Sequence, residues 1–161
     1  MKALTFLILA CCTGGCLPLP APAAAPVTPL GGYFAQPEPV SNVREWVLAM
    51  FRAKEANEIL FDREQLGKAY SVRARVESIR ARYLHLEDGV VCQVAEFSRT
   101  VEDYRNKVDY EPLEMHNQQV LMAKKVGDVV TVVGLLSSVQ NSPLDIPPDP
   151  SAYLSPCGVD L

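Results

Sequence analysis

The sequence lacks the motifs that usually mark a catalytic or metal-binding site. It has two histidines, His85 and His116, and neither forms a repeated spacing pattern with Asp, Glu or Cys of the kind that indicates a metal site. No Gly-rich phosphate loop, G-x-S-x-G or H-E-x-x-H motif is present. His85 alternates with Leu84 and Leu86 and should face solvent, and we expect His116 to be an ordinary surface histidine. We therefore predict a non-enzyme with no cofactor and no metal.

Basic residues and aromatic rings are also scarce. The chain has 15 Lys and Arg against 19 Asp and Glu, and aromatic residues make up 7% of it. Non-specific nucleic-acid binding depends mainly on neutralising phosphates, so an acidic chain is a poor candidate for it. No apolar run reaches the roughly 18–20 residues that a membrane-spanning helix needs. The composition therefore disfavours a nucleic-acid partner and a membrane-spanning helix.

The N-terminus has the form of an export signal. Residues 1–15 combine a cationic start at Lys2, an apolar run of ten residues and small residues directly before Cys16. Small residues before a cysteine resemble the lipobox of bacterial lipoproteins, which implies that Cys16 is lipidated and becomes the new N-terminus. Cys11 is a competing lipidation site, and ordinary secretion with cleavage nearby is the alternative to an anchor.

Residues 16–40 contain the lipidation site and a Pro/Ala-rich tether. Proline fixes φ and removes backbone donors, so we expect an extended spacer that holds a domain away from a membrane surface. The chain should then be lipid-anchored in a bacterial cell envelope and face the periplasm. Leu17 stands where many lipoproteins retained at the inner membrane have Asp, and by that resemblance the outer membrane is favoured. Residues 41–161 should form one domain.

Hydrophobic periodicity predicts that this domain begins with a helix and a three-stranded meander. Asn42 and Glu45 form a capping box, and apolar residues follow at helical spacing to about residue 58. Trp46 on the apolar face should anchor the helix on a sheet. The period then changes to two, which indicates strands. They cover residues 70–79, 82–87 and 90–97, with a turn at 88–89.

A polar insertion, residues 98–125, separates the meander from the most strand-like part of the chain. Pro112 divides the insertion into two segments with helical potential, residues 101–107 and 113–124. The next predicted elements are a strand over 129–138 with a bulge or barrel corner at Gly134, a loop over 141–150 and a strand over 152–161. The predicted fold is mostly β (α+β): a five-stranded OB-fold-like barrel with an N-terminal helix and a helical insertion between strands 3 and 4.

Short motifs spread over residues 43–161 form one pattern. They are Ala56-Asn57, Leu66-Gly67-Lys68, the strand to Ile79, Val91-Cys92-Gln93-Val94, Val126 to Gly134 and Leu154 to Val159. This pattern resembles the tRNA_anti-like group of OB-fold proteins, many of which are small bacterial lipoproteins. Ala74 stands where that group usually has a glycine in the first strand.

Two cysteines belong to the domain, Cys92 and Cys157. An even pair in an oxidising compartment favours a disulfide, and two buried free thiols are the alternative. The OB-fold resemblance implies that the third and fifth strands lie side by side, which would bring these two cysteines within reach of each other.

The binding residues that we predict are mostly basic, because the segment from Arg63 to Arg82 has six basic and two acidic residues. They should form a positive OB face with one stacking ring, although solvated strand charges are the alternative interpretation. These residues are Arg73, Arg75, Arg80, Arg82 and Tyr83.

The leading hypothesis is a lipid-anchored envelope binding module that docks a protein or an anionic glycan through this OB face. The first alternative is a single-stranded nucleic-acid-binding OB domain. The second is a purely structural envelope lipoprotein that associates through the helix over 42–58 or through the insertion. Exposed apolar positions on those two segments would favour the structural alternative.

Overall fold

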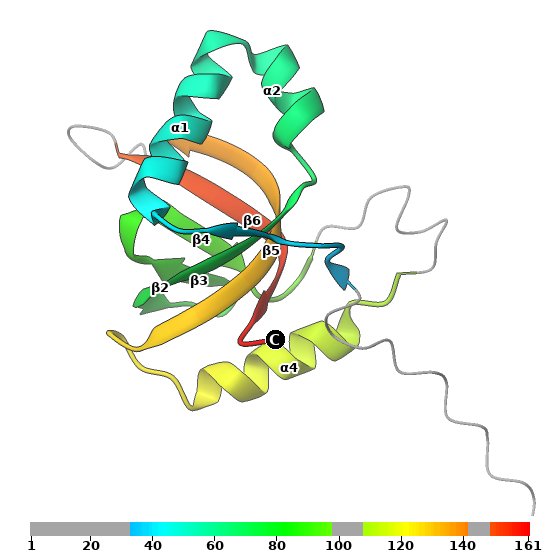
Figure 1. Ribbon diagram of the computed structural model, residues 1–161. Helices are drawn as coiled ribbons and strands as arrows, with labels where there is room; N and C mark the ends of the chain where they lie inside the picture. Colours follow the sequence, from blue (N-terminus) through cyan, green and yellow to red (C-terminus); the bar gives the residue numbers. More distant parts are fainter. Residues whose placement is uncertain (1–32, 98–107, 142–148) are drawn as a thin grey trace, which may run out of the picture.

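A closed barrel of five strands forms the centre of the structure, a computed structural model that describes residues 33–97, 108–141 and 149–161 (Figure 1). The hydrogen-bonded order is β2-β3-β4-β6-β5, and β5 pairs back onto β2 to close the barrel. Only the β4–β6 pair within the barrel is parallel. This order confirms the predicted OB-fold-like barrel. The strands are β2 (Ala69–Ile79), β3 (Tyr83–Leu86), β4 (Val90–Gln93), β5 (Val129–Asn141) and β6 (Pro150–Val159).

Alternating side chains fill the barrel. Branched residues at every second position of the strands, such as Val72, Leu84 and Leu154, have no exposed surface, and each contributes roughly 1.5–3 kcal/mol by leaving water. The pairing of β5 with β6 shifts register between Gly134 and Leu136, which confirms the predicted bulge at Gly134. β5 continues three residues beyond the predicted end at 138, and Pro150, which we predicted in a loop, is the first residue of β6.

Two helices stand at one end of the barrel, α1 (Val43–Ala56) and α2 (Glu58–Gln65). The Asn42 side chain accepts a hydrogen bond from the Glu45 amide, as the capping box predicts. Asn57 separates the helices, because its extended backbone ends α1 while its side chain accepts from the Leu60 amide and caps α2. We did not predict α2, because its eight residues give too short a periodic signal.

Trp46 holds α1 against the barrel. Its ring lies 5.0 Å from the ring of Tyr70 on β2, measured between centroids. Tyr70 is buried, and its hydroxyl donates to the Gln65 side chain at the end of α2. The predicted anchoring role of Trp46 is therefore confirmed, and both helices are tied to the start of β2.

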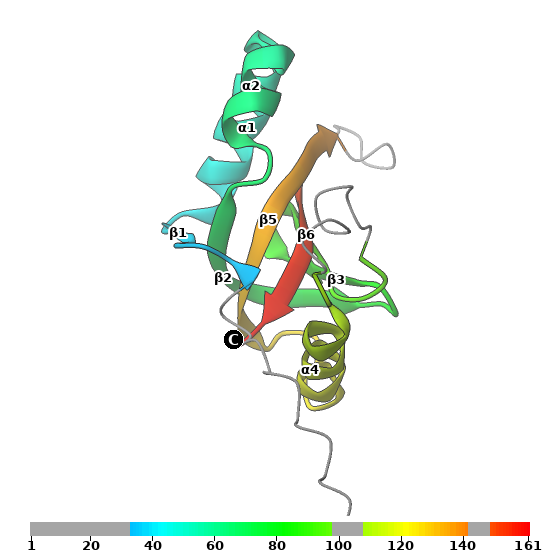
Figure 2. The ribbon, with the colours of Figure 1, turned by 90° about the vertical axis from the view of Figure 1, so that its right-hand side faces the viewer.

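The opposite end of the barrel is covered by α4 (Glu111–Met122), as Figure 2 shows from the side. It begins two residues before the predicted helix, with Pro112 in its first turn. Asn117 is buried, donates to the carbonyls of Val94 and Cys157, and accepts from the Val159 amide. These three bonds join α4 to β6 and to the segment that follows β4.

Strand β4 is shorter than predicted. It ends at Gln93, whose side-chain amide donates to the carbonyls of Ala95 and Glu96, and Glu96 has a positive φ of 53°. The chain therefore turns away from the sheet before residue 97. The predicted helical segment over 101–107 and most of the predicted loop, residues 142–148, lie outside the described residues.

The described fold begins before Ser41, where we expected the domain to start. Strand β1 (Glu38–Val40) pairs in parallel with β2. Phe34 is 4% exposed and packs in a second apolar cluster with Phe97 and Leu113, outside the barrel. A three-residue strand with a central proline has no readable period, so the sequence did not reveal it. The predicted signal (1–15), the lipidation sites Cys11 and Cys16, and most of the predicted tether lie outside the described residues.

A disulfide joins Cys92 of β4 to Cys157 of β6. Both residues are fully buried, and their Cα atoms are 5.6 Å apart. The predicted disulfide is therefore present, and it lies between the two strands that the OB-fold resemblance placed side by side.

The C-terminus is fastened to α4 and β5. Asp160 accepts hydrogen bonds from the Thr131 amide at 2.8 Å and from the Lys124 ammonium at 2.7 Å. The His116 ring lies 2.9 Å from the carbonyl oxygen of Val159. The expectation that His116 is an ordinary surface histidine is therefore wrong, because its ring helps to hold the last strand.

The Asp160 contacts predict a pH-dependent contribution to stability. Burial opposes ionisation, but the Lys124 and Thr131 hydrogen bonds and nearby positive charge outweigh it and hold the pKa of Asp160 below its ordinary value of 3.8. A lowered folded-state pKa stabilises the fold above pH 3.8, and this contribution is lost as pH falls through the folded value. Asp160→Asn should lower the free energy of unfolding by up to about 1 kcal/mol at pH 7, and by progressively less in acid.

Urea unfolding measured from pH 7 down to below pH 4 checks this expectation. Asp62→Asn is the matched control, because Asp62 is exposed on α2 and its carboxylate has no hydrogen bond or ion pair within the described ranges. An Asp160→Asn effect of the same size at every pH would contradict the assigned role of the ionised carboxylate.

Candidate ligand-binding face

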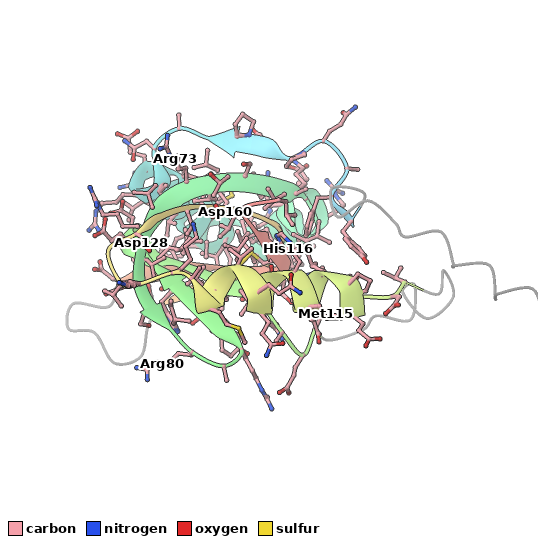
Figure 3. The ribbon with its side chains drawn as sticks, turned by 90° about the horizontal axis from the view of Figure 1, so that it is seen from below. Arg73, Arg80, Met115, His116, Asp128 and Asp160 are labelled. Carbon is pink, nitrogen blue, oxygen red and sulfur yellow. A yellow bond between two sulfur atoms is a disulfide. The ribbon has the colours of Figure 1, made fainter. Side chains whose placement is uncertain are left out.

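The structure does not bring the five predicted binding residues together. Arg73 and Arg75 lie on the part of β2 that pairs with β5, whereas Arg80, Arg82 and Tyr83 lie at the β2–β3 hairpin. Arg80 follows Arg75 by five positions, which is about 16 Å along an extended chain. Figure 3 shows Arg73 and Arg80 on opposite sides of the molecule. The single positive face that we predicted is therefore not formed.

Two of these arginines already have partners within the fold. The Arg75 guanidinium donates to the Gly127 carbonyl at 3.2 Å, and Arg82 pairs with the Glu96 carboxylate at 2.6 Å. Tyr83 is different, because it projects outward from β3 and is 37% exposed. Of the predicted set, it is the one that belongs to a larger group of outward side chains.

That group covers the outer surface of β3, β4 and β6. Strand register aligns His85 with Val91, and Val91 with Tyr153, in one row across the three strands. In the next row Tyr83 is aligned with Gln93, which accepts a 2.8 Å hydrogen bond from the Ser155 hydroxyl. From here on the name OB face means this surface and not the predicted positive face. It is defined by Tyr83, His85, Val91, Gln93, Tyr153 and Ser155, of which Val91 is buried at 6% exposure.

The OB face is held in a fixed conformation. The side-chain oxygen of Gln93 accepts a hydrogen bond from the Ser155 hydroxyl. Its side-chain nitrogen donates to the Ala95 and Glu96 carbonyls. The disulfide lies in the barrel interior and joins β4, which carries Gln93, to β6, which carries Tyr153. A ligand would therefore meet strands and a Gln93 side chain that are already held in place, which reduces the entropy lost on binding.

A cavity of about 330 Å³ adjoins the OB face at His85, Val91 and Tyr153. Its other polar lining includes Arg44 of α1, and Arg44 lies 3.7 Å from the Asp149 carboxylate in an exposed ion pair. The charged residues around the cavity are Arg44, Glu77, Asp88 and Asp149. One guanidinium against three carboxylates makes the cavity electronegative at neutral pH.

The turn that closes one side of this cavity requires glycine. Gly89 has a φ of +81°, and a Cβ placed there would lie 2.5 Å from the Pro150 carbonyl oxygen. The Asp88-Gly89 turn that we predicted for the hairpin therefore also brings the β3–β4 end against the start of β6. The sequence alone showed the turn but not this contact.

No protein-family model, curated protein or solved structure matches the chain. In the described ranges, no helix has both the length and the apolarity needed to cross a membrane. The same ranges contain no group of three or more His, Cys, Asp and Glu placed to hold a metal ion. The interpretation of the OB face therefore rests on its own geometry.

Sequence reasoning found Tyr83 but missed Tyr153. Tyr153 alternates with the buried residues Ala152 and Leu154, so its outward direction could have been predicted from the period of two. Its place beside His85 and Val91 depends on the parallel pairing of β6 with β4, which links residues about 60 positions apart. That pairing is not visible as a local pattern.

Proposed function

We propose that this chain is a non-enzymatic binding module of the bacterial cell envelope that holds a glycan on the OB face. The observation that carries the proposal is the pair of outward tyrosines, Tyr83 on β3 and Tyr153 on β6, which flank β4 and its hydrogen-bonded Gln93–Ser155 pair. Tyrosine offers a flat apolar ring for the C–H face of a sugar, and its hydroxyl can exchange hydrogen bonds with sugar hydroxyls.

The charges beside the OB face favour a neutral or amine-bearing glycan over an anionic one. Three carboxylates and one arginine line the adjoining cavity, and the positive residues Arg73 and Arg75 lie on another part of the barrel. An anionic sugar entering the cavity would meet like charge.

A single-stranded nucleic acid fits the OB face less well. Its phosphates would approach the carboxylates of Glu77, Asp88 and Asp149, and two tyrosines give a short stacking platform. The envelope location, the lipid anchor at Cys16 and the relationship to the tRNA_anti-like group are parts of the proposal that rest on the sequence motifs.

Replacing Tyr153 with alanine tests the proposal. We expect the wild-type chain to bind a β-1,4-linked N-acetylglucosamine tetramer, and Tyr153→Ala to weaken this binding about tenfold, because a stacking ring contributes roughly 1–3 kcal/mol. Tyr83→Ala should weaken it in the same direction. Isothermal titration calorimetry with the tetramer, an oligogalacturonate and an oligothymidine gives the affinities.

The double variant Arg73→Ser/Arg75→Ser is the matched control and should bind the tetramer as the wild type does. Preferred binding of oligothymidine with a steep dependence on salt would replace the proposal with the nucleic-acid alternative. If neither saccharide binds, or if Tyr153→Ala binds the tetramer with unchanged affinity, the glycan proposal fails.

A further inference from the structure

A second surface, separate from the OB face, forms an apolar groove of about 660 Å³ between α4 and the β2–β3 hairpin. One wall consists of Ile79 and Ala81 of the hairpin with Val94 and Ala95 after β4. The other wall is a stripe along the full length of α4. We call this surface the α4 groove.

The α4 stripe follows helical spacing. Glu111, Met115, Gln118 and Met122 succeed one another at intervals of three or four residues, so all four lie on one side of the helix. Met115 is 53% exposed and Met122 is 78% exposed. Figure 3 shows Met115 and His116 on opposite sides of α4, with His116 toward the barrel. The stripe is therefore not part of the core, and α4 leaves its two methionines exposed to solvent.

The groove carries charges of opposite sign on its two walls. The hairpin contributes Arg80, and the first turn of α4 contributes Glu111 and Glu114. Within the described ranges, no ion pair joins Arg80 to either glutamate, and none of the three has another ion-pair partner. A partner with an acidic group on one flank and a basic group on the other would satisfy both walls.

These features identify the type of partner. Methionine side chains are flexible and adapt to varied apolar anchors, as at other surfaces that receive amphipathic helices. α4 has twelve residues and is about 18 Å long, which matches a helix of about three turns. A lipid surface fits poorly, because Glu111 and Glu114 would lose their hydration against the bilayer.

We propose that the α4 groove binds an amphipathic helix of another protein, with an acidic flank against Arg80 and a basic flank against Glu111 and Glu114. This site is distinct from the OB face, so the module would hold a glycan and a protein at the same time. The proposal does not depend on the identity of the glycan or on its binding.

Two synthetic helical peptides of about twelve residues test this proposal. Both carry the same leucine stripe, one with Asp and Lys on the flanks that complement the groove and one with these flanks exchanged. Fluorescence anisotropy with the full-length chain should show the complementary peptide bound about fivefold more tightly, since exposed ion pairs contribute about 0.2–1 kcal/mol each. Met122→Glu should weaken it at least about tenfold by removing an apolar contact and adding a repelled charge.

Gln119→Glu is the matched control, because it makes the same charge change on an exposed position of α4 outside the groove. It should leave peptide affinity within about twofold of the wild type, and thermal unfolding of each variant should confirm that the fold is intact. The proposal is overturned if neither peptide binds, if both bind equally, or if Met122→Glu does not weaken binding. It is also overturned if Met122→Glu abolishes self-association instead, since the occupant is then a second copy of this chain.

Discussion

Replacing Gly134 with valine should lower the free energy of unfolding by at least about 3 kcal/mol, because the barrel has no room for a side chain at this position. A Cβ there would lie 2.9 Å from both the Leu154 Cβ and the Pro156 carbonyl oxygen, and 3.1 Å from the Cys157 Cβ. These atoms belong to β6, which the disulfide holds against β4. β6 therefore cannot move away without disturbing the pairing on its other side.

The Gly134 effect can be separated from the general cost of replacing a glycine. Gly127→Ala is the control, because Gly127 has a φ of +92° but nothing within 4 Å of the added Cβ. That change should cost about 1 kcal/mol through backbone strain alone. Urea unfolding followed by circular dichroism measures both variants. A Gly134→Val variant no less stable than Gly127→Ala would contradict the close approach of β5 to β6.

Removing the disulfide should have a comparable effect. The Cys92→Ala/Cys157→Ala variant should lose about 4 kcal/mol, because the bond closes a loop with a sequence separation of 65 residues and restricts the unfolded chain. The loop contains α4 and β5, so the loss should affect the cooperative unfolding of the whole barrel. Both cysteines are fully buried, so mild reductant should act only when the domain opens.

Chemical denaturation of the double variant, compared with the wild type before and after full reduction in denaturant, provides the measurement. The reduced wild type should resemble the double variant. A loss of less than about 1 kcal/mol for the double variant would contradict the role of the bond in constraining the unfolded chain.

The sequence predicted those parts of the fold that have a local signal. The capping box at Asn42, the alternation of β2 and the β-branched run from Val129 each correspond to an element of the structure. The bulge at Gly134 was predicted because glycine within a strand usually marks one. β1 and α2 were missed, because three and eight residues are too short to establish a period.

The candidate sites were harder to predict, since they depend on which strands become neighbours. Arg73 and Arg80 are close in sequence, but Arg73 lies within β2 and Arg80 follows its end, and the two lie on opposite sides of the molecule in Figure 3. Tyr83 and Tyr153 are distant in sequence and reach the same outer surface because β3 and β6 both pair with β4. Density of charge along the chain was therefore a poor guide to charge density on the surface.

The most direct test of the OB face is a two-dimensional ¹H–¹⁵N NMR titration of the full-length chain with the N-acetylglucosamine tetramer. The account predicts that the largest shift changes fall on β3, β4 and β6, at Tyr83, His85, Gln93, Tyr153 and Ser155. Amides at Arg73, Arg75 and Met115 should change little. Changes concentrated on β2 and β5, or on α4, with the OB face unaffected, would contradict the assignment of the glycan to this surface.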